Sequence, residues 1–212
     1  MSSLTQKAYK GMGMEDWIAG PSSTAPRRVT SELQPLARRV TGDLPAGRRV
    51  LELASGAGLL AIEMAKSGYH QIVALENNRA SVEAARAHAD REGVAVRVRQ
   101  GDYSAMPFPA NRFDRVVCRE GFESFSRPAE VFKEVHRVLK PGGRALFSGV
   151  RRNSSLLDLL AFRSRGISLE RFEQLAAESG FLKCGTEEQE TGYDAWLQKE
   201  ELPAGEYRRI EL

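Results

Sequence analysis

Acidic and small residues follow three apolar runs in the first half of this 212-residue chain. After the first run stands Ser55-Gly56-Ala57-Gly58, whose small side chains let the backbone approach a ligand closely. If a helix starts there, its free amides favour a carboxylate or a phosphate group. The segment therefore predicts a ligand-binding turn, although any strand-to-helix turn can use glycine.

Carboxylates stand at the ends of the next two apolar runs. Glu76 ends QIVALE, 18 residues after Gly58, and can accept hydrogen bonds from both hydroxyls of an adenosine ribose. The alternative is a solvated acid at the start of a helix that begins near Asn78. Asp102, in the segment QGDYS, could accept a hydrogen bond from an adenine amino group. An ordinary turn aspartate is the alternative there.

These residues must be positioned by an alternation of strands and helices. Strands are predicted, in chain order, over residues 49–54, 71–75, 94–98, 113–118, 144–150, 182–188 and 193–199. Helices are predicted from Ser31 to Val40, with Pro35 in or before the first turn, and over residues 59–68, 78–93, 128–139 and 168–180, the fourth ending at a KPGG turn. The alternation predicts parallel pairing, with ligands bound beyond the carboxyl ends of the strands. The valines of residues 94–98 alternate with polar residues, which predicts a strand at a sheet edge.

Composition narrows the class of protein. Hydrophobic residues make up 42% and charged residues 28%, as in globular proteins. The formal charge is +3 and the basic residues are scattered, which argues against a nucleic-acid partner. No apolar stretch has the length of a membrane span or a signal peptide, so a cytoplasmic location without membrane association is expected. The two cysteines and three histidines show no metal-ligand spacing, and no metal is expected.

Taken as a set, five segments resemble the class I S-adenosylmethionine-dependent methyltransferases: VLELASGAG, VALENN, QGDYSAMPFP, NRFDRVVC and RVLKPGGRALF. The resemblance spans roughly residues 36–150, and dehydrogenases do not share its GDxxxMPFP, FD and RVLKPGG segments. It implies a Rossmann-like three-layer αβα sandwich with a seven-stranded, mostly parallel sheet whose last strand is antiparallel. It also implies S-adenosylmethionine as cofactor, S-adenosylhomocysteine as product, and methyl transfer to an acceptor.

The resemblance implies a role for individual residues. The methionine end of the cofactor would be held by Glu52, Ala54, Ser55, Gly56 and Gly58. The adenosine would be held by Glu76 at the ribose, Asn77 against the adenine, Asp102 at the adenine amino group and a backbone contact from Tyr103, while Cys118 and Arg119 would flank the sulfonium. The family's turn usually has glycine in place of Ala54 and more often aspartate in place of Glu52. A Cβ is tolerated at residue 54 if φ stays negative, although it would narrow the pocket.

Methyl transfer from a sulfonium is an in-line displacement in which a catalytic base is optional, and no residue is assigned as catalytic. Glu120 and Glu123 follow the fourth strand, where many relatives have histidine near the second position. Glu123 is interpreted equally as a substrate-binding or basic group and as a surface acid at a helix start. The sequence has no Asn-Pro-Pro-Tyr or Asp-Pro-Pro-Tyr element after that strand, which favours a small acceptor over a nucleic-acid base.

Residues 1–30 are interpreted as a mobile arm or lid, and residues 31–212 as the cofactor-binding domain. Tyr9 and Trp17 of the arm, together with residues 154–165, predict a partly hydrophobic acceptor pocket; equally, they could only dock the arm on the core. A monomer or a homodimer is expected.

Two other functions are considered. A protein of this fold could bind the cofactor without methylating, as a cyclase or a binding module. An NAD-dependent oxidoreductase is disfavoured because Ala61 stands where the third glycine of its fingerprint would be.

Overall fold

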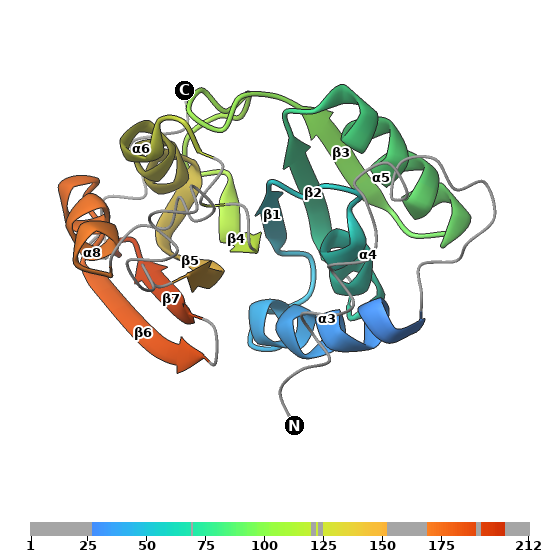
Figure 1. The fold of residues 1–212 in the computed structure, drawn as a ribbon, viewed down its shortest axis with the longest axis horizontal. Helices are drawn as coiled ribbons and strands as arrows, with labels where there is room; N and C mark the ends of the chain where they lie inside the picture. Colours follow the sequence, from blue (N-terminus) through green and yellow to red (C-terminus); the bar gives the residue numbers. More distant parts are fainter. Residues whose placement is uncertain are drawn as a thin grey trace, which may run out of the picture.

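The computed structural model describes residues 27–68, 70–119, 122, 125–151, 169–189 and 192–201. Its strands are β1 (Arg49–Leu53), β2 (Gln71–Glu76), β3 (Val96–Gln100), β4 (Phe113–Arg119), β5 (Leu139–Arg151), β6 (Lys183–Gln189) and β7 (Gly192–Gln198). Its helices are α3 (Arg27–Thr41), α4 (Leu59–Lys66), α5 (Arg79–Arg91), α6 (Pro128–Val138) and α8 (Leu169–Glu178) (Figure 1). The alternation expected from the sequence is confirmed over this part of the chain.

The strands form one seven-stranded sheet in the order β3-β2-β1-β4-β5-β7-β6. Strands β1 to β5 pair in parallel with one another, whereas β7 pairs antiparallel with both β5 and β6. The predicted edge position of β3 and the predicted antiparallel last strand are confirmed. The register sets Leu53 beside Leu75 on one side and Cys118 on the other, so the carboxyl ends of β1, β2 and β4 lie next to one another.

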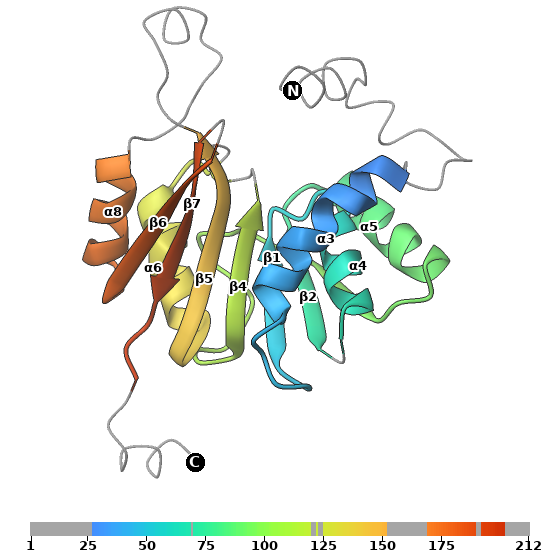
Figure 2. The ribbon, with the colours of Figure 1, turned by 90° about the horizontal axis from the view of Figure 1, so that it is seen from below.

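Helices cover both faces of the sheet, which confirms the three-layer sandwich. Helices α6 and α8 lie on one face and helices α3, α4 and α5 on the other (Figures 1 and 2). The first face holds a buried cluster that includes Phe132, Phe147 and Phe172, and the rings of Phe132 and Phe147 stack with centroids 5.2 Å apart. A second buried cluster, which includes Ile72 and Val117, lies under the other helices.

Helix α3 differs from its prediction at its amino end and at Pro35. It begins at Arg27 rather than at Ser31, and Pro35 lies in its interior rather than in its first turn. Proline removes one backbone hydrogen bond from a helix. Here Leu33 precedes the proline and Ala37 and Val40 follow it, and all three are buried. Packing of this apolar face therefore sustains the helix through the proline.

The start of β5 also differs from its prediction. The sequence predicts a turn at KPGG and a strand from Arg144, but β5 begins at Leu139, which pairs with Phe113. The register then shifts, and Arg144 pairs with Arg115. Residues 140–143 therefore stand opposite the single residue Asp114, and the chain bulges there. Leu139 is fully buried, and its burial accounts for strand pairing ahead of a turn sequence.

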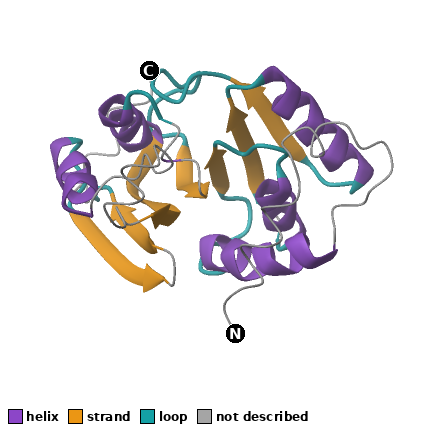
Figure 3. Cartoon of the chain, in the orientation of Figure 1, coloured by secondary structure: helices purple, strands orange, loops and turns teal. Residues whose placement is uncertain are grey.

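A loop of residues 101–112 crosses from the edge strand β3 to the central strand β4 (Figure 3). The loop starts beside the carboxyl end of β2, where the Gly101 amide donates to the Glu76 carbonyl, and reaches β4 beside the end of α6, where the Asn111 amide donates to the Arg137 carbonyl. None of the helices described is long and apolar enough to cross a membrane.

Candidate functional site

The turn between β1 and α4 is built from left-handed backbone. Ala54, Gly56 and Gly58 have φ values of 52°, 52° and 77°. The negative φ under which a Cβ is tolerated at residue 54 is therefore not found: the turn keeps the left-handed shape that glycine favours even though a Cβ is present. At Gly58 an added Cβ would lie 2.9 Å from the Cβ of Ala85 in α5. Glycine at that position therefore lets α4 and α5 approach each other closely.

Glu52 lies at the end of β1, next to this turn, and is buried with only 4% of its surface exposed. Burial raises the pKa of its carboxyl to about 8, against the opposing effects of a hydrogen bond from the Ala61 backbone and the charge of Arg119. Oε2 of Glu52 is buried and has no hydrogen-bond partner among the described residues, and the same holds for Oγ of Ser55. Two polar atoms beside the turn are therefore available to a ligand.

Glu76 ends β2 and is also buried. Its Oε2 accepts a hydrogen bond of 2.9 Å from the Gly56 amide. Its Oε1 accepts bonds of 2.9 Å from the amides of Asn77 and Asn78 and of 3.1 Å from the Tyr103 hydroxyl. Asn78 separately caps α5, since its side chain accepts from the Ser81 amide. Glu76 therefore fixes the β1–α4 turn to the end of β2.

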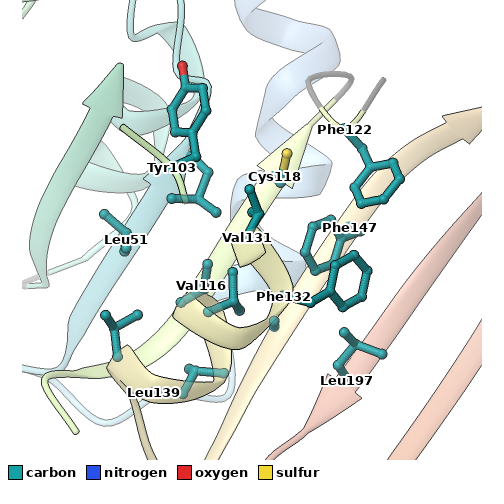
Figure 4. Packing of buried hydrophobic residues seen from close by; sticks show 14 of the residues in the cluster. Leu51, Tyr103, Val116, Cys118, Phe122, Val131, Phe132, Leu139, Phe147 and Leu197 are labelled. Atoms are coloured by element: carbon teal, nitrogen blue, oxygen red, sulfur yellow. The ribbon is translucent and has the colours of Figure 1, made fainter. Parts of the chain in front are cut away.

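The side chain of Tyr103 extends into this cluster. Its hydroxyl donates to Glu76 and accepts a bond of 3.1 Å from the Asn77 amide, and its ring lies 5.1 Å from the Phe125 ring. Burial and the neighbouring Glu76 raise the pKa of Tyr103. In Figure 4 the hydroxyl lies at the end of the ring that points away from the packed cluster. The resemblance implied only a backbone contact for Tyr103, because a pattern of residue types does not show a side-chain hydrogen bond between a loop and a strand.

Asp102 lies at the exposed rim of the site. Its Oδ1 accepts from the Ser104 amide at 2.8 Å and the Ser104 hydroxyl at 2.6 Å, and its Oδ2 pairs with Arg127 at 2.7 Å. The hydrogen bonds from Ser104, with the charge of Arg127, lower the pKa of Asp102. The Asp-x-Ser spacing indicates this local turn, whereas no sequence signal identified Arg127.

Cys118 and Arg119 end β4, beside β1. Cys118 is buried and pairs in register with Leu53, and Figure 4 places its sulfur toward the carboxyl end of the strand. The charge of Arg119 acts on Glu52. The structure therefore brings Glu52, Glu76 and Arg119 together at the carboxyl ends of three adjacent strands.

Some predicted site residues lie outside the residues that the structure describes. They are Tyr9, Trp17, Glu120, Glu123 and the segment 154–165.

Comparison with known proteins finds similarity to methyltransferases. Residues 51–147 match the family model described as a methyltransferase domain. The ubiquinone biosynthesis O-methyltransferase of Pseudomonas aeruginosa (strain UCBPP-PA14) is 36% identical over 110 residues, which cover 51% of this chain and 47% of that protein. The chain spans about half the length of the curated relatives that it matches.

Solved structures share the fold. The [4+2]-cyclase SpnF has a TM-score of 0.72 at 19% identity, with 87% of this chain and 85% of that chain covered. A Haemonchus contortus phosphoethanolamine N-methyltransferase 2, in complex with phosphomonomethylethanolamine and S-adenosylhomocysteine, has a TM-score of 0.65 at 24% identity, with 82% and 42% covered. At these identities the likeness extends to the fold alone.

Proposed function

We propose that this chain, whose residues 51–147 match a methyltransferase domain, is a class I S-adenosylmethionine-dependent methyltransferase that binds S-adenosylmethionine and methylates a small, partly hydrophobic acceptor. The observation that carries the proposal is the pair of buried carboxyls, Glu52 and Glu76, at the ends of adjacent parallel strands. Between them lies the left-handed turn of residues 54–58. Sites in open α/β sheets lie at such strand ends.

The polar atoms of this edge suit the polar groups of the cofactor. Oε2 of Glu52 and Oγ of Ser55 have no partner within the described part of the chain, and a buried polar atom is normally hydrogen-bonded. The ammonium and carboxylate of the methionine end would supply those partners. The charge of an ammonium would also favour the ionised form of Glu52, whose pKa burial raises to about 8.

Glu76 retains capacity for the ribose. Each oxygen of a carboxylate offers about two acceptor positions. Oε1 already accepts from three donors, whereas Oε2 accepts from the Gly56 amide alone. We therefore place a ribose hydroxyl on the remaining position of Oε2. Tyr103 is a positioning residue in this proposal, because it holds the other oxygen of the same carboxylate.

S-adenosylmethionine supplies an electrophilic methyl group on a sulfonium that leaves readily as a thioether. The chain's own contribution is to orient the donor and to exclude water, since holding donor and nucleophile in line supplies much of the acceleration. Cys118 and Arg119 would flank the sulfonium from the end of β4. Asp102 would meet the adenine amino group at the rim, where Oδ1 and Oδ2 now bond Ser104 and Arg127.

Calorimetric titration with S-adenosylmethionine, S-adenosylhomocysteine and NAD tests the proposal without knowledge of the acceptor. Saturable binding of both sulfur ligands is expected. Glu76→Ala and Asp102→Ala should each weaken that binding by about 1–3 kcal/mol, because partners on the ligand lose their hydrogen bonds. Glu83→Ala is the control, since Glu83 is an exposed acid on α5 that pairs with Arg79. Unchanged affinities in the first two variants, or binding of NAD alone, would contradict the assignment.

The fold shared with the [4+2]-cyclase SpnF supports a second candidate function, in which the bound cofactor gives no methyl transfer. A panel of phenol, amine and activated-carbon acceptors separates the two. Formation of S-adenosylhomocysteine with any of them supports methylation, whereas tight cofactor binding without turnover on any of them supports the non-methylating function.

A further inference from the structure

A cavity lies near the amino ends of β1 and β4, whereas Glu52 and Glu76 lie near the carboxyl ends of their strands. It has a volume of about 640 Å³, within the range of small-molecule sites. It is bordered by the loop between α3 and β1, by the residues before β4 and by the bulge of residues 140–143. Figure 2 shows the α3–β1 loop beside the amino ends of β1 and β4. The cavity is therefore separate from the proposed cofactor site.

Two cations in this cavity share one carboxylate. Asp114 pairs with Arg48 at 3.1 Å and with Lys140 at 2.8 Å, and all three line the cavity. A single carboxylate neutralises only one of two positive charges. This side of the cavity therefore has a positive charge in excess.

Two further cations share a second carboxylate. Asp43 pairs with Arg115 at 3.1 Å and with Arg144 at 3.6 Å, and both arginines line the cavity. Among the described residues, the remaining charged residue in its lining is Glu201. Four cations therefore face three carboxylates, so the charge around the cavity favours an anion.

Arg115 is the observation that points to a ligand. Its side chain is 4% exposed, yet within the described part of the chain its Nε and Nη1 have no hydrogen-bond partner, while its Nη2 contacts Asp43. The Trp196 ring lies against both guanidinium groups. Its centroid is 5.1 Å from Cζ of Arg115 and 4.6 Å from Cζ of Arg144. The face of the tryptophan ring attracts the cations, but it supplies no hydrogen-bond acceptor in the guanidinium plane, where the N–H groups lie. Buried donors of this kind normally have an acceptor.

We propose that this cavity binds the phosphate group of a small molecule, held by Arg115 and Arg144 and by Lys140 at its rim. Phosphate offers several strong acceptor oxygens and a charge of about −1.5 to −2 at pH 7, which suits unpartnered guanidinium donors and an excess of positive charge. The proposal does not depend on cofactor binding at the other edge.

Titration with inorganic phosphate and with pyrophosphate, at constant ionic strength balanced with chloride, tests the proposal on the full chain. Saturable binding to the unmodified protein is expected. Arg115→Met and Arg144→Gln should each weaken it by roughly tenfold or more, as expected for the loss of a charge-assisted hydrogen bond. Arg144 is 40% exposed, so its variant keeps the proposal testable if Arg115→Met does not fold.

Arg79→Gln is the matched control, because it removes the same charge from an 81% exposed side chain on α5. It should bind phosphate as the unmodified protein does. Equal weakening in all three variants, or no saturable binding to the unmodified protein, would overturn the proposal. Titration of Arg144→Gln with S-adenosylhomocysteine separates the two sites, since cofactor binding there should be unchanged.

Discussion

Ala54 provides a direct test of the turn that the proposed cofactor site requires. Its φ of 52° is a left-handed conformation, in which the Cβ of an L-residue crowds its own backbone. Glycine at the same position would keep the turn and remove the crowding. Ala54→Gly should therefore stabilise the fold or leave it unchanged, in contrast to the usual result of replacing alanine by glycine.

The magnitude follows from three opposing effects. Relief of the left-handed conformation is worth about 1–2 kcal/mol. The freer unfolded chain of a glycine variant offsets about 0.4–1 kcal/mol of that gain. Ala54 is half-buried against the core, so the lost methyl costs a further part of the roughly 0.8 kcal/mol of a fully buried one. The net expectation is a gain of about 0.5 kcal/mol in the free energy of unfolding.

Ala87→Gly is the matched substitution, because Ala87 is exposed in the middle of helix α5. There glycine should cost about 1 kcal/mol through lost helix propensity. The two variants are compared by denaturant unfolding and by Tm. They should differ by about 1.5 kcal/mol, or roughly 3–6 °C in Tm for a chain of this size.

An equal loss of stability in the two variants would refute the reasoning, because it would mean that residue 54 has negative φ in solution. The same pair can be titrated with S-adenosylhomocysteine. A change in affinity at Ala54→Gly without a change at Ala87→Gly would assign the effect to the turn rather than to global stability.

Two further predictions concern the same edge of the sheet. Gly58→Ala should lower the free energy of unfolding by about 2–4 kcal/mol, because it combines left-handed strain with a Cβ that would lie 2.9 Å from that of Ala85. Gly56→Ala should lower it by only about 1–2 kcal/mol, because an added Cβ there would have nothing within 4 Å. Equal Tm values for the two variants would contradict this prediction. Burial raises the pKa of Glu52 in the folded protein to about 8, against an ordinary 4.5. Between these pH values the folded protein retains a proton that the unfolded chain has released. The contribution of Glu52 to the free energy of unfolding therefore falls as pH rises, by at most about 1.4 kcal/mol per pH unit. Denaturant unfolding at pH 5, 6.5 and 8 should show that Glu52→Gln loses this dependence, and parallel curves for the two proteins would exclude it.

Most of the fold is predictable because its local signals agree. Glycine at residues 56 and 58 follows a short apolar run and precedes an amphipathic one, so propensity and periodicity indicate the same strand, turn and helix. The alternation of valine with polar residues in β3 likewise identifies a sheet edge. The sequence signals fail where burial opposes them. Pro35 indicates a helix boundary and residues 140–143 indicate a turn, but buried residues on either side of Pro35, and Leu139 before the bulge, decide the structure.

The candidate site was predictable in its residue types but not in its hydrogen bonding. Carboxylates at strand ends are visible in the sequence, whereas the bonds that join Glu76 to Gly56 and Tyr103 cross between elements 20 and 27 residues apart. The positive φ of Ala54 could not be predicted, because residue type alone favours negative φ for alanine. The cavity around Arg115 gives no sequence signal, since its cations come from separate segments of the chain.

The position of β7 has a consequence for how the protein is made. Strand β6 leaves the ribosome before β7, yet it joins the sheet only through β7. Until residues 192–198 have emerged and paired, β5 has an open side whose backbone groups can pair with any extended chain. A nascent or prematurely ended chain that stops before Gly192 would expose that edge and leave β6 unattached. Protection from aggregation during synthesis therefore depends on β7, the last of the described strands to be made.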